Sequence, residues 1–511
     1  MKRKLLYIIA VLTLIISFAF PLAACTDKQY EPSLLKENIV DDNYDNYYEI
    51  FVYSFCDSNG DGYGDLNGVT KKLDYIRDLG YTGIWLMPIN DSPSYHGYDV
   101  RDYYSINSKY GTVADYENLV KKAHEKGIKV IMDLVVNHTS ATSPWFMSAV
   151  KYQNGKIDDS TYADWYNFFD TKPNGNGYHK NGSVYYEGRF DSSMPDLNLE
   201  SAGVRAEIDN IMKFWLEKGT DGFRLDGVKY YYGTSGNSNC VEFCSWIKQT
   251  ALKYNENAYI IGEMWDSASA IERFYKSGAD SFFYFPGYGA QGSFAMSVRS
   301  PDGANVYWNA LNTMVEIANG YIPAPFLGNH DTARIAGIMS RDAADIKFAY
   351  GLLSMCNGNT FTYYGDEIGM LGSYNDPDKR IGMLWDNKKT GMTKPPPETT
   401  TREYVFDGVK EQLQDSNSIL NYYKICNNAR NAFPALMRGD IERISYDDGQ
   451  VLAFKKTYKG ESVTVIINFA LSEKSVSGIA GTLAQGICVG GSIQQNGSTF
   501  KMPSKSIAIL N

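Results

Sequence analysis

The chain has 511 residues, and 44% of them are hydrophobic, which is typical of a globular protein and excludes a largely disordered one. This length accommodates one large domain together with smaller ones. A formal net charge of −10 argues against a polyanionic partner such as nucleic acid and is compatible with a neutral substrate.

The N-terminus has the pattern of a targeting segment. Three basic residues (2–4) precede an apolar stretch from Leu5 to Phe20, as in a secretory signal peptide. The sequence LAAC (22–25) then resembles a bacterial lipobox, in which the cysteine is acylated and becomes the first mature residue. We therefore predict a signal peptide over 1–24, a lipid anchor on Cys25 and a flexible polar stalk over 25–44. An uncleaved membrane anchor is the alternative, and both place the chain outside the cytoplasm, tethered to the cell membrane.

Short apolar runs alternate with amphipathic stretches from about residue 45. Runs such as KVIMDLVV (129–136) are too short and too β-branched for helices, so they are interpreted as buried parallel strands. The predicted strands cover 48–55, 83–88, 129–136, 222–226, 259–263, 281–285, 324–328 and 360–365. Helical spacing of apolar residues covers 69–79, 116–126, 204–218, 241–254 and 343–355. Eight strands with intervening helices predict an α/β fold, a closed (β/α)8 TIM barrel.

Two segments depart from this alternation. The segment 139–200 is too long for a structureless loop, so we predict an inserted subdomain after the third strand. Residues 438–511 alternate in the manner of strands and carry no helical pattern, which predicts a C-terminal antiparallel β-sandwich. The barrel is thereby assigned to 45–138 and 201–437. Six cysteines beyond Cys25 lack the spacing of a disulfide framework and are expected to be mostly free buried thiols, with a disulfide left open.

Three acidic residues stand at the ends of predicted strands. Asp226, Glu263 and Asp331 end the motifs GFRLD, YIIGE and FLGNHD. Active sites of strand-helix barrels lie where the strands end. Two carboxyl groups facing one substrate, with a third nearby, are the groups required to cleave a glycosidic bond. The alternative is that these acids only cap the helices that follow.

Four motifs in chain order resemble those of the α-amylases of glycoside hydrolase family 13. They are DLVVNH (133–138), GFRLD (222–226), GE (262–263) and NHD (329–331). The resemblance implies a retaining double displacement, in which Asp226 is the nucleophile, Glu263 the general acid and base, and Asp331 the stabiliser of the cationic transition state. In that mechanism the first two carboxyl groups lie about 5–5.5 Å apart.

Further residues are assigned roles at the substrate by the same resemblance. Arg224, by contrast, is assigned from its position two residues before Asp226 on the same strand face, from which it can hold the Asp226 carboxylate ionised. Tyr98 would stack on the sugar at the cleavage site, and His138 and His330 would donate hydrogen bonds to it. Three more residues match positions that contact substrate or join the polar network around it: Lys229, Asp102 and Arg334. A purely structural salt bridge is the alternative for Asp102 and Arg334.

A candidate calcium loop follows the first strand. Its oxygen ligands stand at alternate positions, with the carbonyl of Tyr63 between side chains; they are Asp57, Asn59, Asp61, Tyr63 and Asp65. Gly68 at the twelfth position rules out a true EF-hand, and a Gly/Asp turn without metal is the alternative. Similar loops in the family imply a structural Ca²⁺ here. A second calcium at Asn137 is left open, because Tyr230 stands where the family usually has a histidine.

The expected substrates are starch and maltooligosaccharides. MPDLN (194–198) resembles the neopullulanase-like intermediate branch of the family, whereas the calcium loop is typical of its oligo-glucosidase-like members. The combination favours hydrolysis of α-1,4-glucosidic bonds, with tolerance of α-1,6 branches left open. Alternatives are an α-glucosidase or oligo-1,6-glucosidase, a glucanotransferase on the same site, and a noncatalytic starch-binding lipoprotein. Other glucan-binding proteins of the cell surface are candidate partners.

Overall fold

The structure, a computed structural model, describes residues 35–234, 236–372 and 375–511. The predicted signal peptide, the acylation residue Cys25 and the stalk up to residue 34 lie outside the described residues. In the part of the chain that is described, no helix combines the length and the apolar character needed to span a membrane.

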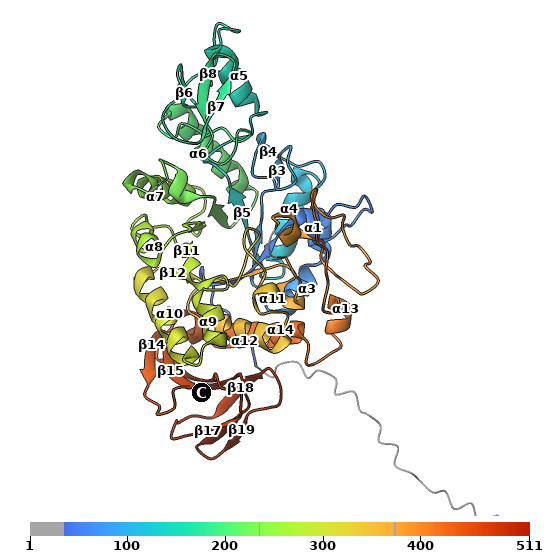
Figure 1. The fold of residues 1–511 in the computed structure, drawn as a ribbon, viewed down its shortest axis with the longest axis vertical. Helices are drawn as coiled ribbons and strands as arrows, with labels where there is room; N and C mark the ends of the chain where they lie inside the picture. Colours follow the sequence, from blue (N-terminus) through green and yellow to red (C-terminus); the bar gives the residue numbers. More distant parts are fainter. Residues whose placement is uncertain (1–34, 235, 373–374) are drawn as a thin grey trace, which may run out of the picture.

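Eight parallel strands form the centre of the fold (Figure 1). They are β1 (Asn46–Ile50), β2 (Gly83–Leu86), β5 (Lys129–Leu134), β9 (Gly222–Leu225), β10 (Tyr259–Gly262), β11 (Ser281–Phe283), β12 (Ile322–Ala324) and β13 (Thr360–Tyr363). Successive strands pair with each other, and β13 pairs back onto β1. A parallel bridge between Phe326 and Phe361 joins the remaining ends of the sheet. The predicted closed barrel is therefore confirmed.

Helices cover the outside of the barrel. The longer ones are α4 (Val113–His124), α6 (Ala202–Glu217), α7 (Ser238–Leu252), α8 (Ala268–Tyr275), α10 (Gly303–Ala318), α12 (Ala343–Ser354) and α14 (Ile419–Ala432). In α4, Thr112 and Asp115 form a reciprocal capping box that fixes the start of the helix. Its buried residues follow helical spacing and face the barrel: Tyr116, Leu119, Val120 and Ala123. Shorter helices are α9 (Ser293–Arg299), α11 (Ile335–Ile338), α13 (Val409–Gln412) and α15 (Pro434–Arg438).

Three predicted elements differ from the structure. The first strand ends at Ile50, and the remaining apolar residues form α1 (Val52–Phe55), because a short apolar run does not distinguish a buried strand from a helical turn. The helix expected over 69–79 is divided at Lys72 into α2 (Leu66–Lys71) and α3 (Leu73–Asp78). The seventh strand covers Ile322–Ala324 and overlaps its predicted range only at Ala324.

The inserted segment and the C-terminal segment lie at opposite ends of the barrel (Figure 1). After β5 the chain forms α5 (Pro144–Gln153) and an antiparallel sheet of β6 (Phe168–Phe169), β7 (Tyr178–Asn181) and β8 (Val184–Glu187). The segment between β2 and α4 contains a short antiparallel pair of strands, β3 (Asn90–Asp91) and β4 (Asp102–Ile106).

The C-terminal segment consists of two antiparallel sheets. One contains β14 (Asp440–Ile444), β15 (Val451–Tyr458), β16 (Glu461–Asn468), β18 (Leu483–Cys488) and β21 (Ser506–Leu510). The other contains β17 (Lys474–Ser477), β19 (Gln494–Asn496) and β20 (Thr499–Met502). Apolar residues of both sheets form one core, among them Val451, Ile466, Val476 and Phe500. This packing is that of the expected sandwich.

The alternation of side chains along the barrel strands determines which charged groups enter the interior. Residues in the lower interior are apolar, including Tyr47, Ile131 and Ile261. Glu49 and Asp133 stand two positions further along the same strands, and Glu263 stands two positions after Ile261, just past the end of β10. All three therefore point to the same side as these apolar residues. The six described cysteines are free, and all except Cys488 are buried, as expected.

Candidate active site

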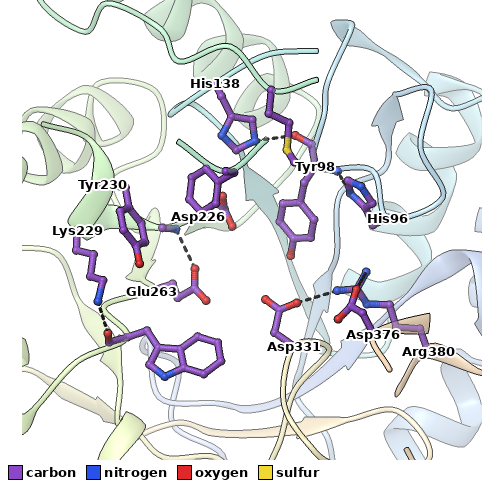
Figure 2. A pocket seen from close by; sticks show the side chains of 14 residues that line it. His96, Tyr98, His138, Asp226, Lys229, Tyr230, Glu263, Asp331, Asp376 and Arg380 are labelled. Atoms are coloured by element: carbon purple, nitrogen blue, oxygen red, sulfur yellow. Dashed lines mark hydrogen bonds and ion pairs between the residues drawn. The ribbon is translucent and has the colours of Figure 1, made fainter. Parts of the chain in front are cut away.

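A pocket of about 330 Å³ opens at the carboxyl ends of the barrel strands (Figure 2). Its volume lies at the lower end of the range of small-molecule sites. Asp226 directly follows β9, Glu263 directly follows β10, and Asp331 lies in the loop after β12. Figure 2 shows these three carboxyl groups directed toward one common space. The structure thus brings together the three acids that the sequence singled out.

Arg224 connects the carboxylates beneath the pocket. Its Nη1 lies 2.7 Å from Asp226 Oδ1 and 2.5 Å from Asp133 Oδ1, and its Nη2 lies 3.0 Å from Glu263 Oε2. The side chain is fully buried in β9 and reaches the interior because its neighbours Phe223 and Leu225 face the helices. One guanidinium therefore bridges Asp226 and Glu263. The distance between their nearest carboxylate oxygens is limited by the width of the guanidinium and the two contacts of 2.7 and 3.0 Å.

Glu263 is buried, and its pKa lies well above that of an ordinary glutamate. Burial, together with the nearby charges of Asp226 and Asp331, raises the pKa of Glu263 to about 7, although Arg224 opposes the shift. The backbone N–H of Gly227 donates to Glu263 Oε2 at 2.9 Å. Gly227 has a left-handed φ of 50°, a conformation that glycine adopts readily. A carboxyl group with this pKa is suited to general acid catalysis near neutral pH.

Asp331, in contrast to Glu263, is held in its ionised form. Burial disfavours its charge, but two cationic partners outweigh that effect and keep the pKa of Asp331 well below its ordinary value. His330 Nε2 lies 3.0 Å from its Oδ2, and Arg380 Nη2 lies 2.7 Å from its Oδ1. Arg380 comes from the 3₁₀ helix η4 (Pro377–Arg380), which follows the last barrel strand. Asp331 is therefore a permanent anion at the wall of the pocket.

Tyr98 and His138, which were expected to contact the sugar, both line the pocket, and Tyr98 lies on the same side as Asp331. Tyr98 Oη is 2.7 Å from His330 Nε2, and the two rings stack with centroids 5.5 Å apart. His138 donates its Nε2–H to the carbonyl of Tyr98 at 3.2 Å. Burial lowers the pKa of His138, so its ring is neutral at physiological pH. His138 thus fixes the backbone that carries Tyr98.

Lys229 and two aromatic residues frame the mouth of the pocket. Lys229, in the 3₁₀ helix η1 (Val228–Tyr230), donates to the carbonyl of Trp265 at 2.8 Å. Trp265 stacks on Phe285 and keeps 37% of its surface exposed. Phe190, from the inserted segment, is 43% exposed and packs edge-on to Tyr230. Exposed aromatic faces of this kind provide apolar surface with little conformational freedom to lose.

Two residues assigned to the polar network do not reach the pocket. Asp102 is exposed on β4, where its carboxylate accepts the N–H of Tyr104 at 2.9 Å. Arg334 is fully buried and pairs with Asp366 at 2.8 Å, behind the pocket wall. Arg334 thus makes the structural salt bridge given as its alternative, whereas the printed contact of Asp102 is a local hydrogen bond within β4.

Several residues of the site were not assigned from the sequence. Asp133 and Glu49 lie on inward-facing strand positions and could have been found from the two-residue alternation. Trp265 follows Glu263 by two positions, just beyond the recognised motif. Arg380 and Asp376 come from an irregular segment after β13, which carries no periodic signal.

The candidate calcium loop contains an all-oxygen donor set. Asp57 accepts the N–H groups of Gly60 and Gly62 at 2.6 and 2.8 Å, while Asp65 accepts those of Ser58 and Gly68. Among the residues that the structure describes, no three His, Cys, Asp or Glu side chains are grouped as metal ligands. The aspartates instead stabilise the turn and the start of α2. The chemistry of the donors nevertheless fits a hard cation such as Ca²⁺.

At the second possible calcium position an arginine is present. Asn137 donates to Asp196 Oδ1 at 3.1 Å, and Arg189 Nε lies 3.3 Å from Asp196 Oδ2. Arg189 also pairs with Glu187. The acidic groups between the inserted segment and the barrel are thus neutralised by a side chain of the protein.

Comparisons with known proteins agree with this geometry. Residues 49–439 match the family "Alpha amylase, catalytic domain". The chain is 39% identical over 436 residues to Alpha-amylase 3 of Dictyoglomus thermophilum, which covers 83% of this chain and 84% of the relative. It is 30% identical over 525 residues to an oligo-1,6-glucosidase of Parageobacillus thermoglucosidasius, with 84% and 90% covered.

Among solved structures, Eubacterium rectale Amy13B superimposes with a TM-score of 0.88 at 38% identity, covering 94% of this chain and 99% of that one. The family match spans most of the chain and includes every strand-end acid of the pocket. The chain therefore belongs to the α-amylase catalytic-domain family and is a retaining glycoside hydrolase.

Proposed function

We propose that this protein is an α-amylase that hydrolyses internal α-1,4-glucosidic bonds in starch and maltooligosaccharides with retention of configuration. The observation that carries the proposal is the bridging of Asp226 and Glu263 by Arg224 at the floor of one pocket. In a retaining enzyme the two carboxyl groups lie about 5–5.5 Å apart, and two carboxylates held by one guanidinium are compatible with that spacing.

The pKa values of Glu263 and Asp331 are shifted in the directions that their proposed steps require. Asp226, paired with the buried Arg224, attacks the anomeric carbon, and Glu263 donates a proton to the departing glycosidic oxygen. Glu263 then removes a proton from the water that hydrolyses the glycosyl-Asp226 ester. Asp331 stays ionised beside the sugar ring and stabilises its developing positive charge. The presence of all these acids argues against a noncatalytic starch-binding lipoprotein.

The identity of the products tests this specificity. Phe190 and Trp265 extend the pocket on two sides, which favours a chain of several sugars over a single terminal one. The resemblance of residues 194–198 to the neopullulanase-like branch supports tolerance of α-1,6 branches. Chromatography of digests of amylose, pullulan and maltotriose is expected to show mixed short oligosaccharides. Release of glucose alone would favour an α-glucosidase or oligo-1,6-glucosidase, and products longer than the substrate would indicate a glucanotransferase.

We also propose that the loop 57–65 binds a structural Ca²⁺. The residues that would hold it are Asp57, Asn59, Asp61 and Asp65, with the carbonyl of Tyr63. Excess EGTA is expected to lower the Tm by several degrees, because an ion bound only to the folded state stabilises it. Asp61→Asn, which keeps the side-chain acceptor for the N–H of Tyr63, should have a lower Tm that EGTA no longer changes. Identical melting curves of the wild type with and without EGTA would reject the calcium.

The location of the protein is proposed from its N-terminus. A basic segment, an apolar segment and the LAAC sequence support export and acylation of Cys25, which would tether the enzyme to the outer face of the cell membrane near glucan-binding partners. Mass spectrometry of the mature N-terminus is expected to find a diacylglyceryl cysteine at position 25. An unmodified Cys25 or an uncleaved signal segment would contradict the anchor.

A further inference from the structure

Glu49 is a buried carboxylate that the proposed reaction steps do not use. It projects from β1 into the barrel interior and is 1% exposed. Its Oε1 lies 2.6 Å from His330 Nδ1 and 3.4 Å from the backbone N of His330. A carboxylate so deeply buried is costly unless a cation or several donors compensate it. His330 is the group in contact with it that is able to carry that charge.

His330 faces acceptors at both ring nitrogens. On the side opposite Glu49, His330 Nε2 lies 3.0 Å from Asp331 Oδ2 and 2.7 Å from Tyr98 Oη. A neutral imidazole has one N–H, so one of its nitrogens would direct a lone pair at a carboxylate. Only the imidazolium donates at both ends. Burial disfavours this charge, but Asp331 and Glu49 outweigh it and raise the pKa of His330 to about 10.

The other charged and titratable groups around His330 come from several elements. Asp133 on β5 accepts a hydrogen bond from Tyr98 Oη at 3.3 Å, and Arg224 Nη1 on β9 lies 3.4 Å from the same oxygen. Arg380 of η4 donates its Nε–H to the carbonyl of His330 at 3.2 Å. The two arginines oppose a positive charge on His330. The carboxylates of Glu49 and Asp331 are in direct contact with the ring and therefore dominate.

We propose that Glu49 is a positioning residue that keeps His330 doubly protonated during catalysis and thereby fixes the orientation of Tyr98 and Asp331. When Nε2 carries a proton, that proton is shared between Asp331 and the Tyr98 hydroxyl, and the hydroxyl directs its own proton toward Asp133. When Nε2 lacks a proton, Tyr98 can donate to His330 instead and loses its bond to Asp133. The inference rests on the proposed function only in so far as Tyr98 and Asp331 contact the sugar.

The first test measures the protonation of His330 and needs no substrate. The chain has five histidines, so ¹⁵N-histidine spectra are simple, and the His330→Gln spectrum assigns the resonance. In the wild type, His330 is expected to stay doubly protonated up to at least about pH 9, and in Glu49→Gln its titration is expected to move down by more than about one pH unit. Glu207→Gln, which removes a carboxylate from α6, is the matched control and should leave the titration unchanged.

The second test measures the consequence for the reaction. With α-glucosyl fluoride, whose leaving group needs no protonation by Glu263, fluoride release by Glu49→Gln is expected to fall at least about tenfold as the pH rises through the lowered pKa of His330. Glu49→Asp, which keeps the charge, should restore the wild-type pH profile.

Three outcomes would overturn the proposal. The first is that His330 of the wild-type protein loses a proton near pH 6.5, the ordinary pKa of histidine. This outcome can be observed without any variant. Another is an unchanged His330 titration in Glu49→Gln. The third is a lowered titration with an unchanged pH profile of fluoride release. A wild-type enzyme that hydrolyses no α-glucan while His330 still titrates as expected would instead contradict the proposed function alone.

Discussion

Asp226→Asn and Glu263→Gln are each expected to lower kcat on maltooligosaccharides by at least about a thousandfold. An amide in place of Asp226 is a poor nucleophile, so the glycosyl ester does not form. An amide in place of Glu263 has no proton to donate to the leaving oxygen, whereas the wild-type group is protonated up to about pH 7. Both replacements keep the shape of the side chain, so the Tm is expected to change little.

The two variants should differ with an activated substrate. Glucosyl fluoride has a leaving group that departs without protonation, so Glu263→Gln is expected to release a burst of fluoride while Asp226→Asn releases none. Asp209→Asn, on the surface of α6 beside Lys253, is the matched control and should retain full activity. Wild-type turnover in both active-site variants would defeat the assignment.

Replacing Arg224 is expected to affect stability and catalysis together. Arg224→Ala leaves Asp133, Asp226 and Glu263 without their shared cation, and an uncompensated buried charge costs about 3–5 kcal/mol of unfolding free energy. Arg224→Lys keeps one charge but cannot contact three carboxylates at once, so kcat should fall by about 100-fold or more.

The stability loss in Arg224→Ala should depend on pH. Burial already raises the pKa of Asp133 to about 6, and removing Arg224 raises that pKa further. A group whose folded pKa is raised stabilises the fold at low pH and loses that contribution as the pH rises through the folded pKa. The deficit in Tm relative to the wild type should therefore be larger at pH 8 than at pH 5.

Arg77→Ala, which removes a half-exposed ion pair with Glu37, is the control and is expected to lower the unfolding free energy by less than about 1 kcal/mol at either pH. Equal effects of the two replacements would contradict the bridging role.

Much of the architecture could be predicted from the sequence because it follows local patterns. The strand β5 is a β-branched apolar run, and the motifs with Asp226, Glu263 and Asp331 directly follow strands, so barrel geometry alone brings them together. The first strand was predicted too long, since Val52–Phe55 is apolar in either conformation. Asp102 was placed at the sugar by a position match, but its side chain turns back onto its own strand pair.

The network around the acids could not be predicted, because it depends on contacts between distant segments. Glu49 meets His330 across 281 positions of sequence, and Arg380 meets Asp331 from a segment without periodicity. The protonation states follow from these contacts. The pKa values of Glu263 and Asp331 move in opposite directions because Glu263 is buried near two carboxylates whereas Asp331 touches His330 and Arg380.

The most direct measurement traps the covalent intermediate in Glu263→Gln with a 5-fluoroglycosyl fluoride and maps the labelled peptide by mass spectrometry. In this mutant, water attack on the ester lacks its base, so the intermediate should accumulate. We expect one added sugar per molecule, on Asp226. A sugar attached to any other residue, or a first-formed product of inverted configuration without a trapped ester, would contradict the account.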